Sequence, residues 1–142
     1  MKRAQSLLFS LLFFILFSGC GKASPSLTLT YSSYNDGAYS GYCVTASAED
    51  DAAVQNLLFS ATSGCLFAEK EEPDNAVSGT VTVPNGTVVV WLPDDTSRQT
   101  TVQLTVTAFD APGKQLASQK MTFTLSGSQW QVIEEKNVQP VQ

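Results

Sequence analysis

The chain has 142 residues, of which 13 are acidic and 8 basic, and its formal net charge at pH 7 is −5. It contains no histidine, which excludes Ser-His-Asp and Cys-His nucleophilic systems and the common histidine-based zinc sites. The excess of carboxylates disfavours nucleic acids and anionic lipid surfaces as partners, because both are bound through basic patches.

The first twenty residues have the pattern of an export signal. Two basic residues, Lys2 and Arg3, precede an apolar stretch over residues 7–17, and two small residues follow it. This order is typical of a segment that directs export and is then removed. The apolar stretch is shorter than the roughly 20 residues that a transmembrane helix needs. We therefore predict a cleaved signal peptide over residues 1–19.

The residues at the expected cleavage point, Leu16-Phe17-Ser18-Gly19-Cys20, resemble the lipobox of bacterial lipoproteins. The resemblance implies a diacylglyceryl group on the thiol of Cys20, cleavage before that residue, and a protein held at a membrane surface by lipid. Two or more acyl chains anchor stably, at about 0.8 kcal/mol per buried CH₂. By the same resemblance, Gly21 after the cysteine favours the outer membrane if the source has one. The alternative is an ordinary secretory signal that ends near a cysteine.

The chain after the signal has the length of one domain. Removing 19 of the 142 residues leaves 123, with 6 basic and 13 acidic residues and a formal net charge of −7. Residues 20–26 are small and polar and predict a short tether. We expect the folded domain over residues 27–135 and a C-terminal tail over 136–142.

Apolar residues alternate with polar ones through most of the domain, as in β-strands with one buried face. Turn signals rich in Gly, Pro, Asn and Asp separate the runs, and only residues 50–55 suggest a helical turn. About seven or eight strands predict an all-β fold, a single antiparallel β-sandwich. The residues predicted to face inward are Leu27, Leu29, Tyr31, Val44, Ala46, Ala48, Leu57, Phe59, Ala61, Val81, Val83, Val88, Val90, Leu92, Val102, Leu104, Val106, Ala108, Met121, Phe123 and Leu125, and a last short strand is expected over 130–133.

Two cysteines remain beside Cys20, namely Cys43 and Cys65. In an oxidising compartment pairing is the default, so we predict a disulfide, which would stabilise the fold by roughly 3 kcal/mol in the chain-entropy model. The spacing lacks a Cys-X-X-Cys motif and disfavours a redox pair. Because Val44 faces inward, Cys43 is expected to face outward, which makes the disulfide a peripheral one.

Four stretches carry a resemblance to a family of folds: residues 44–51 (VTASAEDD), 56–64 (NLLFSATSG), 88–95 (VVVWLPDD) and 101–125, which reads as a terminal hairpin with an Asp-x-x-Gly turn. In this order they resemble the Ig-like and PKD-like β-sandwich modules of bacterial cell-surface proteins. The resemblance implies a structural or protein-interaction role, and some of these modules bind Ca²⁺.

Aromatic residues form one candidate site. Exposed Tyr and Trp are good anchors for protein partners or, by stacking, for sugar rings. Trp91 alternates out of phase with Val90 and Leu92, so we expect it on the other face of its strand, under a second layer or in an apolar patch. The alternative is packing against the C-terminal segment that carries Trp130. The candidate ligand-binding residues are Tyr31, Tyr34, Tyr39 and Trp91, with Tyr42 nearby.

Acidic residues near the turns form a second candidate site. Carboxylates on neighbouring loops could supply the oxygen ligands of Ca²⁺, although Asp is also common in solvated turns, where it accepts bonds from backbone amides. The calcium candidates are Asp50, Asp51, Asp94, Asp95 and Asp110. Paired carboxylates act on a glycosidic bond only in a cleft, which nothing in the sequence indicates.

The sequence therefore predicts a non-enzymatic envelope lipoprotein with no catalytic residue, resident metal or cofactor. Its expected role is that of a structural or protein-interaction module, and a glycan- or Ca²⁺-binding surface module is the alternative. The expected partners are the membrane, through the lipid, and an envelope protein.

Overall fold

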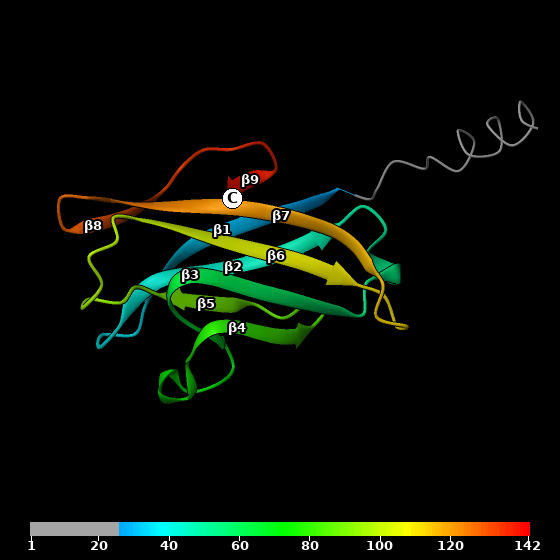
Figure 1. Cartoon of the computed structure of the whole chain (residues 1–142), viewed down its shortest axis with the longest axis horizontal. Coiled ribbons are helices and arrows are strands. Elements are labelled where there is room, and N and C mark those ends of the chain that lie inside the picture. The colour runs from blue at the N-terminus through cyan, green and yellow to red at the C-terminus, as the bar shows by residue number, and fades with distance from the viewer. Residues whose placement is uncertain (1–25) are drawn as a thin grey trace, which may run out of the picture.

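The computed structural model describes residues 26–142, which form β-strands with two short 3-10 helices (Figure 1). The predicted all-β class is confirmed. The predictions for the signal peptide, for Cys20 and for residues 21–25 of the tether lie outside the described residues. Between residues 26 and 142 no helix is long and apolar enough to cross a membrane. The elements are β1 (Leu27–Asn35), β2 (Ser40–Ala48), η1 (Asp51–Ala53), β3 (Asn56–Ala68), η2 (Pro73–Asn75), β4 (Val77–Pro84), β5 (Val89–Leu92), β6 (Thr101–Phe109), β7 (Gln115–Ser126), β8 (Gln129–Val132) and β9 (Val138–Pro140).

The strands form one continuous, curled sheet. Its order is β8-β7-β6-β3-β5-β2-β1-β9, with β4 paired to the other side of β3. Residues 56–61 of β3 pair with β6, whereas residues 65–68 pair with β5. One wall of the sheet contains β8, β7, β6 and β3, and the other contains β3, β5, β2, β1 and β9. The two walls face each other across a core as in a sandwich, but β3 belongs to both. The architecture is therefore a half-barrel, and not two separate sheets.

A bend in β3 joins the two walls. The register with β4 shifts between residues 60 and 65, and Gly64 adopts a positive φ of 89°. A Cβ on Gly64 would overlap the carbonyl oxygen of Leu92 and the indole of Trp91. The Trp91 Nε1–H donates to the carbonyl of Ser63 at 2.8 Å. The turn signal here thus produces a bulge inside a strand, because pairing continues on both sides of it.

The main core lies between the walls and contains most of the residues predicted to face inward. Its centre is aromatic: Trp91 stacks on Phe123 of β7, with ring centroids 4.1 Å apart and planes 4° from parallel. Trp91 is 0 % exposed. The burial of these apolar and aromatic side chains is the main contribution to the stability of the domain.

Strand β5 has the opposite phase from the prediction. Trp91 and Val89 face the main core, whereas Val90 and Leu92 form a second buried cluster with Phe67 on the outer side. Every residue of β5 is buried. The prediction was wrong because a strand covered on both faces has no polar residues to mark its phase.

The C-terminal residues expected to form a tail belong to the sheet. β9 pairs in parallel with β1, and Val138 is buried in the main core. The Leu29 amide donates to the carbonyl of Asn137, and the Val141 amide donates to that of Tyr31, both at 2.8 Å. A three-residue strand is too short for alternation to reveal it.

The predicted disulfide is wrong, because Cys43 and Cys65 are both free. Cys43 pairs with Val90 and Cys65 with Leu92, on opposite sides of β5. Two strand spacings of about 4.8 Å, together with an offset of two residues along β5, place their Cα atoms roughly 12 Å apart, beyond the roughly 7 Å that a disulfide tolerates. Cys43 does face away from the main core, as expected, and packs on the second cluster.

Candidate functional site

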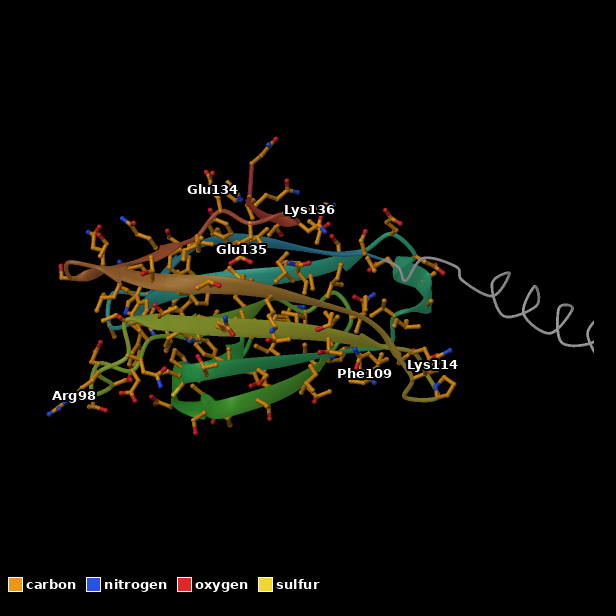
Figure 2. The ribbon with its side chains drawn as sticks, turned by 45° about the horizontal axis from the view of Figure 1, so that its top comes forward. Arg98, Phe109, Lys114, Glu134, Glu135 and Lys136 are labelled. Atoms are coloured by element: carbon orange, nitrogen blue, oxygen red, sulfur yellow. The ribbon has the colours of Figure 1, made fainter. Side chains whose placement is uncertain are left out.

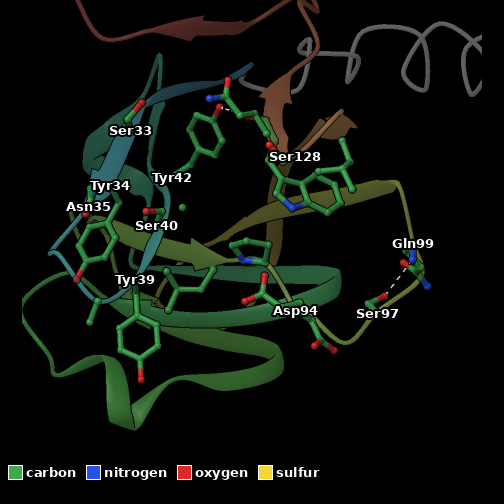
Figure 3. A pocket seen from close by; sticks show the side chains of 18 residues that line it. Ser33, Tyr34, Asn35, Tyr39, Ser40, Tyr42, Asp94, Ser97, Gln99 and Ser128 are labelled. Carbon is green, nitrogen blue, oxygen red and sulfur yellow. Dashed lines mark hydrogen bonds between the residues drawn. The ribbon is translucent and has the colours of Figure 1, made fainter.

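A pocket of about 880 Å³ lies at one end of the half-barrel. Three connections surround it: the β1–β2 hairpin, the β5–β6 loop and the β7–β8 hairpin. Its volume falls in the range of about 300–1,000 Å³ that is usual for small-molecule sites. Figure 3 shows tyrosines of the first hairpin on one side and Asp94, Ser97 and Gln99 of the β5–β6 loop on the other.

The side of the pocket formed by the β1–β2 hairpin is organised by the carboxylate of Asp36. Its Oδ1 accepts hydrogen bonds from the amides of Ala38 (2.9 Å) and Tyr39 (2.7 Å), and its Oδ2 accepts one from the Tyr34 hydroxyl (3.0 Å). The bonds from the two amides hold the pKa of Asp36 below its ordinary value of 3.8. Desolvation, followed by the bond to Asp36, raises the pKa of Tyr34. One ionised side chain therefore positions two tyrosines of the pocket.

The side of the pocket formed by the β5–β6 loop is organised in the same way by Asp94. Its Oδ1 accepts from the Thr96 hydroxyl (2.7 Å) and the Thr96 amide (2.9 Å), and these two bonds lower the pKa of Asp94. The backbone amide of Ser97 donates to the backbone carbonyl of Asp94 at 3.1 Å. The backbone amide of Gln99 donates to the hydroxyl of Ser97 at 3.2 Å. Asx and Ser turns of this kind give a loop without secondary structure a defined shape.

The inner side of the pocket rests on the main core. Tyr42 stacks on Phe123 at 5.3 Å, and its hydroxyl donates to the carbonyl of Trp130 at 2.6 Å. The Trp130 ring meets Trp91 edge to face, at 5.3 Å and 85°. A Cβ on Gly41 would overlap the carbonyl of Trp91, so a glycine is needed where β2 approaches β5 beside the pocket. These contacts fix the pocket rings before any ligand arrives.

The pocket has a negative electrostatic character. Among its lining residues are two carboxylates, Asp94 and Asp95, and no Lys, Arg or His. Arg98 is on the same loop, but Figure 2 shows it pointing away from the body of the molecule. Anionic ligands are disfavoured by this arrangement.

Only part of the predicted aromatic site is assembled. Tyr34 and Tyr39 line the pocket, and Tyr39 is 45 % exposed. Tyr31 packs against the main core. Trp91 offers no ligand-binding surface because its side chain is wholly buried, and its contact with Trp130 confirms the alternative of packing against the C-terminal segment. The sequence placed Tyr42 beside this group and indicated Trp130 as a packing partner, but assigned neither to the site, and both line the pocket. The signal that could have indicated their role is their position close to the glycine-containing turns of the two hairpins.

The five aspartates proposed for calcium are not brought together. Asp94 and Asp95 border the pocket, whereas Asp50 and Asp51 precede β3 and Asp110 follows β6. The start of β3 pairs with the end of β6, and Figure 2 shows this end of the molecule, with Phe109 and Lys114, opposite Arg98. In the described part of the chain, no group of three or more Asp, Glu, Cys or His residues is arranged for a metal ion.

Comparisons of the chain with protein-family models, with curated proteins and with solved structures find no match of any of these three kinds.

Proposed function

We propose that this chain is a lipid-anchored, non-enzymatic binding protein of the bacterial envelope, and that its pocket faces away from the membrane. The observation that carries the proposal is the position of the two ends of β1. Leu27 begins the strand opposite Ala48, whereas Asn35 ends it at the pocket. The described chain therefore begins at the opposite end of the domain from the β1–β2 hairpin (Figure 1), whose residues line the pocket.

The dimensions support this orientation. The eight steps from Leu27 to Asn35 in β1, at about 3.3 Å each, place the pocket end of the strand about 26 Å from Leu27. The seven steps of chain from Cys20 to Leu27 reach about 25 Å at most. A lipid on Cys20 would thus keep the β2–β3 and β6–β7 connections near the membrane and present the pocket to the surroundings.

The electrostatics of the pocket support a binding role over a catalytic one. Cleavage of a glycosidic bond by two carboxylates needs a general acid whose pKa is raised, so that it carries a proton at neutral pH. The hydrogen bonds from Thr96 lower the pKa of Asp94, which keeps this carboxylate ionised and a poor proton donor. The pocket lining also contains no Cys, His or Lys.

The resemblance to Ig-like envelope modules belongs to the same proposal. Two walls of mainly antiparallel strands around an aromatic core support it, whereas the shared strand β3 distinguishes this domain from two separate sheets. The interaction role of such modules agrees with a pocket built from connections at one end of the domain.

Lipid attachment is tested by metabolic labelling with a clickable fatty acid, in wild type and in Cys20→Ala, followed by membrane fractionation. We expect label and membrane association in wild type and the loss of both in the variant. Wild-type protein that is unlabelled and fractionates as soluble would reject the anchor and leave an ordinary secreted domain.

The orientation is tested in vesicles with lipidated protein that carries Cys43→Ala and Cys65→Ala. A dye is placed at Lys114→Cys or, in a matched sample, at Ser97→Cys, and energy transfer to an acceptor at the lipid surface is measured. We expect stronger transfer from position 114. Equal transfer, or stronger transfer from position 97, would contradict a pocket that faces away from the membrane.

A further inference from the structure

We propose that the pocket binds a neutral sugar ring within an oligosaccharide. This inference rests on the proposed function, since it takes the pocket as the binding end of the domain and names the class of ligand. A pyranose ring has flat C–H faces and a rim of hydroxyl groups. A matching site needs aromatic rings for the faces and uncharged or acceptor groups for the rim.

The aromatic part of the site is held in place by the core. Trp130 is half-buried and braced by Trp91, and Tyr42 is held by Phe123 and by the carbonyl of Trp130. Tyr39, which is 45 % exposed, lies on the β1–β2 hairpin with Tyr42, whereas Trp130 lies on the β7–β8 hairpin. Aromatic faces carry partial negative charge, so they attract the weakly positive C–H groups of a sugar. Because the rings of Trp130 and Tyr42 are fixed in advance, little of their side-chain entropy is lost on binding.

The polar part of the site suits hydroxyl groups. The lining includes the amide side chains of Asn35, Gln99 and Gln129 and the hydroxyls of Ser40 and Ser128. Amides and hydroxyls both donate and accept hydrogen bonds, as the two-sided chemistry of a sugar hydroxyl requires. These residues come from all three connections around the pocket, so a ring placed between them would meet partners on several sides.

The charge of the pocket disfavours acidic sugars, and a basic peptide is the competing class that this charge would favour. Two observations favour the neutral sugar. Asp94 and Asp95 are exposed to solvent, and ion pairs at such positions contribute only about 0–1 kcal/mol. The Oδ1 atom of Asp94 already accepts two hydrogen bonds from Thr96. The half-buried groups near the core, which contribute most to binding, are aromatic and uncharged.

The test uses the full lipidated protein in a non-ionic detergent without a sugar head group. Maltohexaose, cellohexaose and chitohexaose serve as neutral probes, hexagalacturonate as the acidic probe and hexalysine as the basic probe. Binding is followed by tryptophan fluorescence and by calorimetry. Trp91 is wholly buried, so a fluorescence change reports Trp130. We expect saturable binding of at least one neutral hexasaccharide and of neither charged probe.

The variants locate the binding. Tyr39→Ala removes an exposed ring and is expected to fold normally while weakening binding about tenfold, equivalent to about 1.4 kcal/mol. Trp130→Phe keeps an aromatic ring against Trp91 and provides a second variant, with an expected loss of severalfold. Ile133→Ala, which is exposed and outside the pocket, is the matched control and should bind like wild type.

Three results would overturn the inference: no binding of any neutral probe in the millimolar range, binding that Tyr39→Ala and Trp130→Phe leave unchanged, or preferential binding of a charged probe. Binding of hexalysine that Asp94→Asn and Asp95→Asn abolish would assign the pocket to a basic peptide instead. Failure of sugar binding with normal fatty-acid labelling of the same preparation would leave the lipid-anchored protein intact as a proposal. Loss of labelling with normal sugar binding would reject only the anchor.

Discussion

Trp91 and Trp130 meet edge to face at 5.3 Å, but they belong to two different regions of the molecule. Trp91 is sealed in the main core, with its ring against Phe123 and its N–H bonded to Ser63. Trp130 lies on the pocket side of the same contact, where one part of its ring meets the core and the pocket opens beside it. The core region is defined by strands paired on both sides. The pocket region is defined by three connections whose shape depends on side-chain hydrogen bonds.

The comparison shows that one residue type can serve stability in one place and recognition in the next. In the core, ring packing is backed by β3, β5 and β7. At the pocket, the carboxylates of Asp36 and Asp94 carry out the organising role through bonds to nearby amides and hydroxyls. Substitutions in the core should therefore change global stability, and substitutions at the pocket should change local order and binding.

The largest expected effect comes from truncating the two tryptophans separately. Trp91→Ala should reduce the free energy of unfolding by about 3–5 kcal/mol, the usual cost of removing a buried aromatic side chain. Trp130→Ala should cost roughly 1 kcal/mol, because its side chain is only half-buried. Urea unfolding of both variants checks this. Equal losses would remove the distinction between core and pocket.

A second expected effect concerns the bend in β3 and its matched glycine control. Gly64→Ala should destabilise the protein by about 3 kcal/mol or more, because it combines a positive φ with overlap against Leu92 and Trp91. Gly86→Ala has nearly the same φ, 86°, but open space around the new Cβ, so it should cost only about 1 kcal/mol. Thermal melting of the pair separates the two contributions. Similar melting temperatures would mean that the bend relaxes easily.

Acid should loosen the rim of the pocket before it affects the core. Asp36 and Asp94 have pKa values below 3.8 in the folded protein, so their stabilising effect is complete above the ordinary pKa of the unfolded chain. It is lost as the pH falls through the lower folded values. NMR signals of the Tyr39 and Thr96 amides should shift in that window, while the Trp91 indole signal stays constant. Asp36→Asn should remove the response of the Tyr39 amide and leave that of the Thr96 amide.

The smallest expected effect is that of a reducing agent. Because β5 separates Cys43 from Cys65, dithiothreitol should leave the melting temperature unchanged. Both thiols should react with iodoacetamide in unfolded protein that has not been reduced. A fall in melting temperature on reduction, or protected thiols, would restore the disulfide and require a different arrangement around β5.

The sequence predicted most of the strands, because polar and apolar residues alternate wherever one face is solvated. This holds for β6, where Val102, Leu104 and Val106 are buried, and for the β7 run that contains Met121 and Phe123. Alternation predicted the wrong facing for the residues of β5, which is covered on both faces. It did not reveal β9, which is too short to show a period.

The candidate site was predicted only in part. Tyr34 and Tyr39 were chosen because tyrosines cluster near one hairpin, and both line the pocket. Tyr42 and Trp130 were not assigned to it, since their contact joins residues 88 positions apart along the chain. Trp91 was assigned to a binding surface because it alternates out of phase with Val90 and Leu92. Its burial against Phe123, in another strand, left no local signal.

The sequence by itself determined the all-β class, the main buried faces and the positions of several turns, since these follow from local alternation and from residues that favour tight turns. Only the tertiary structure decided that β3 bends to join two walls, that β5 keeps the cysteines apart, and that three distant connections meet around a pocket. The physical reason is that these features depend on which strands become neighbours. That choice is made by packing and hydrogen bonding between segments far apart in the chain, and it leaves no periodic signal in any one of them.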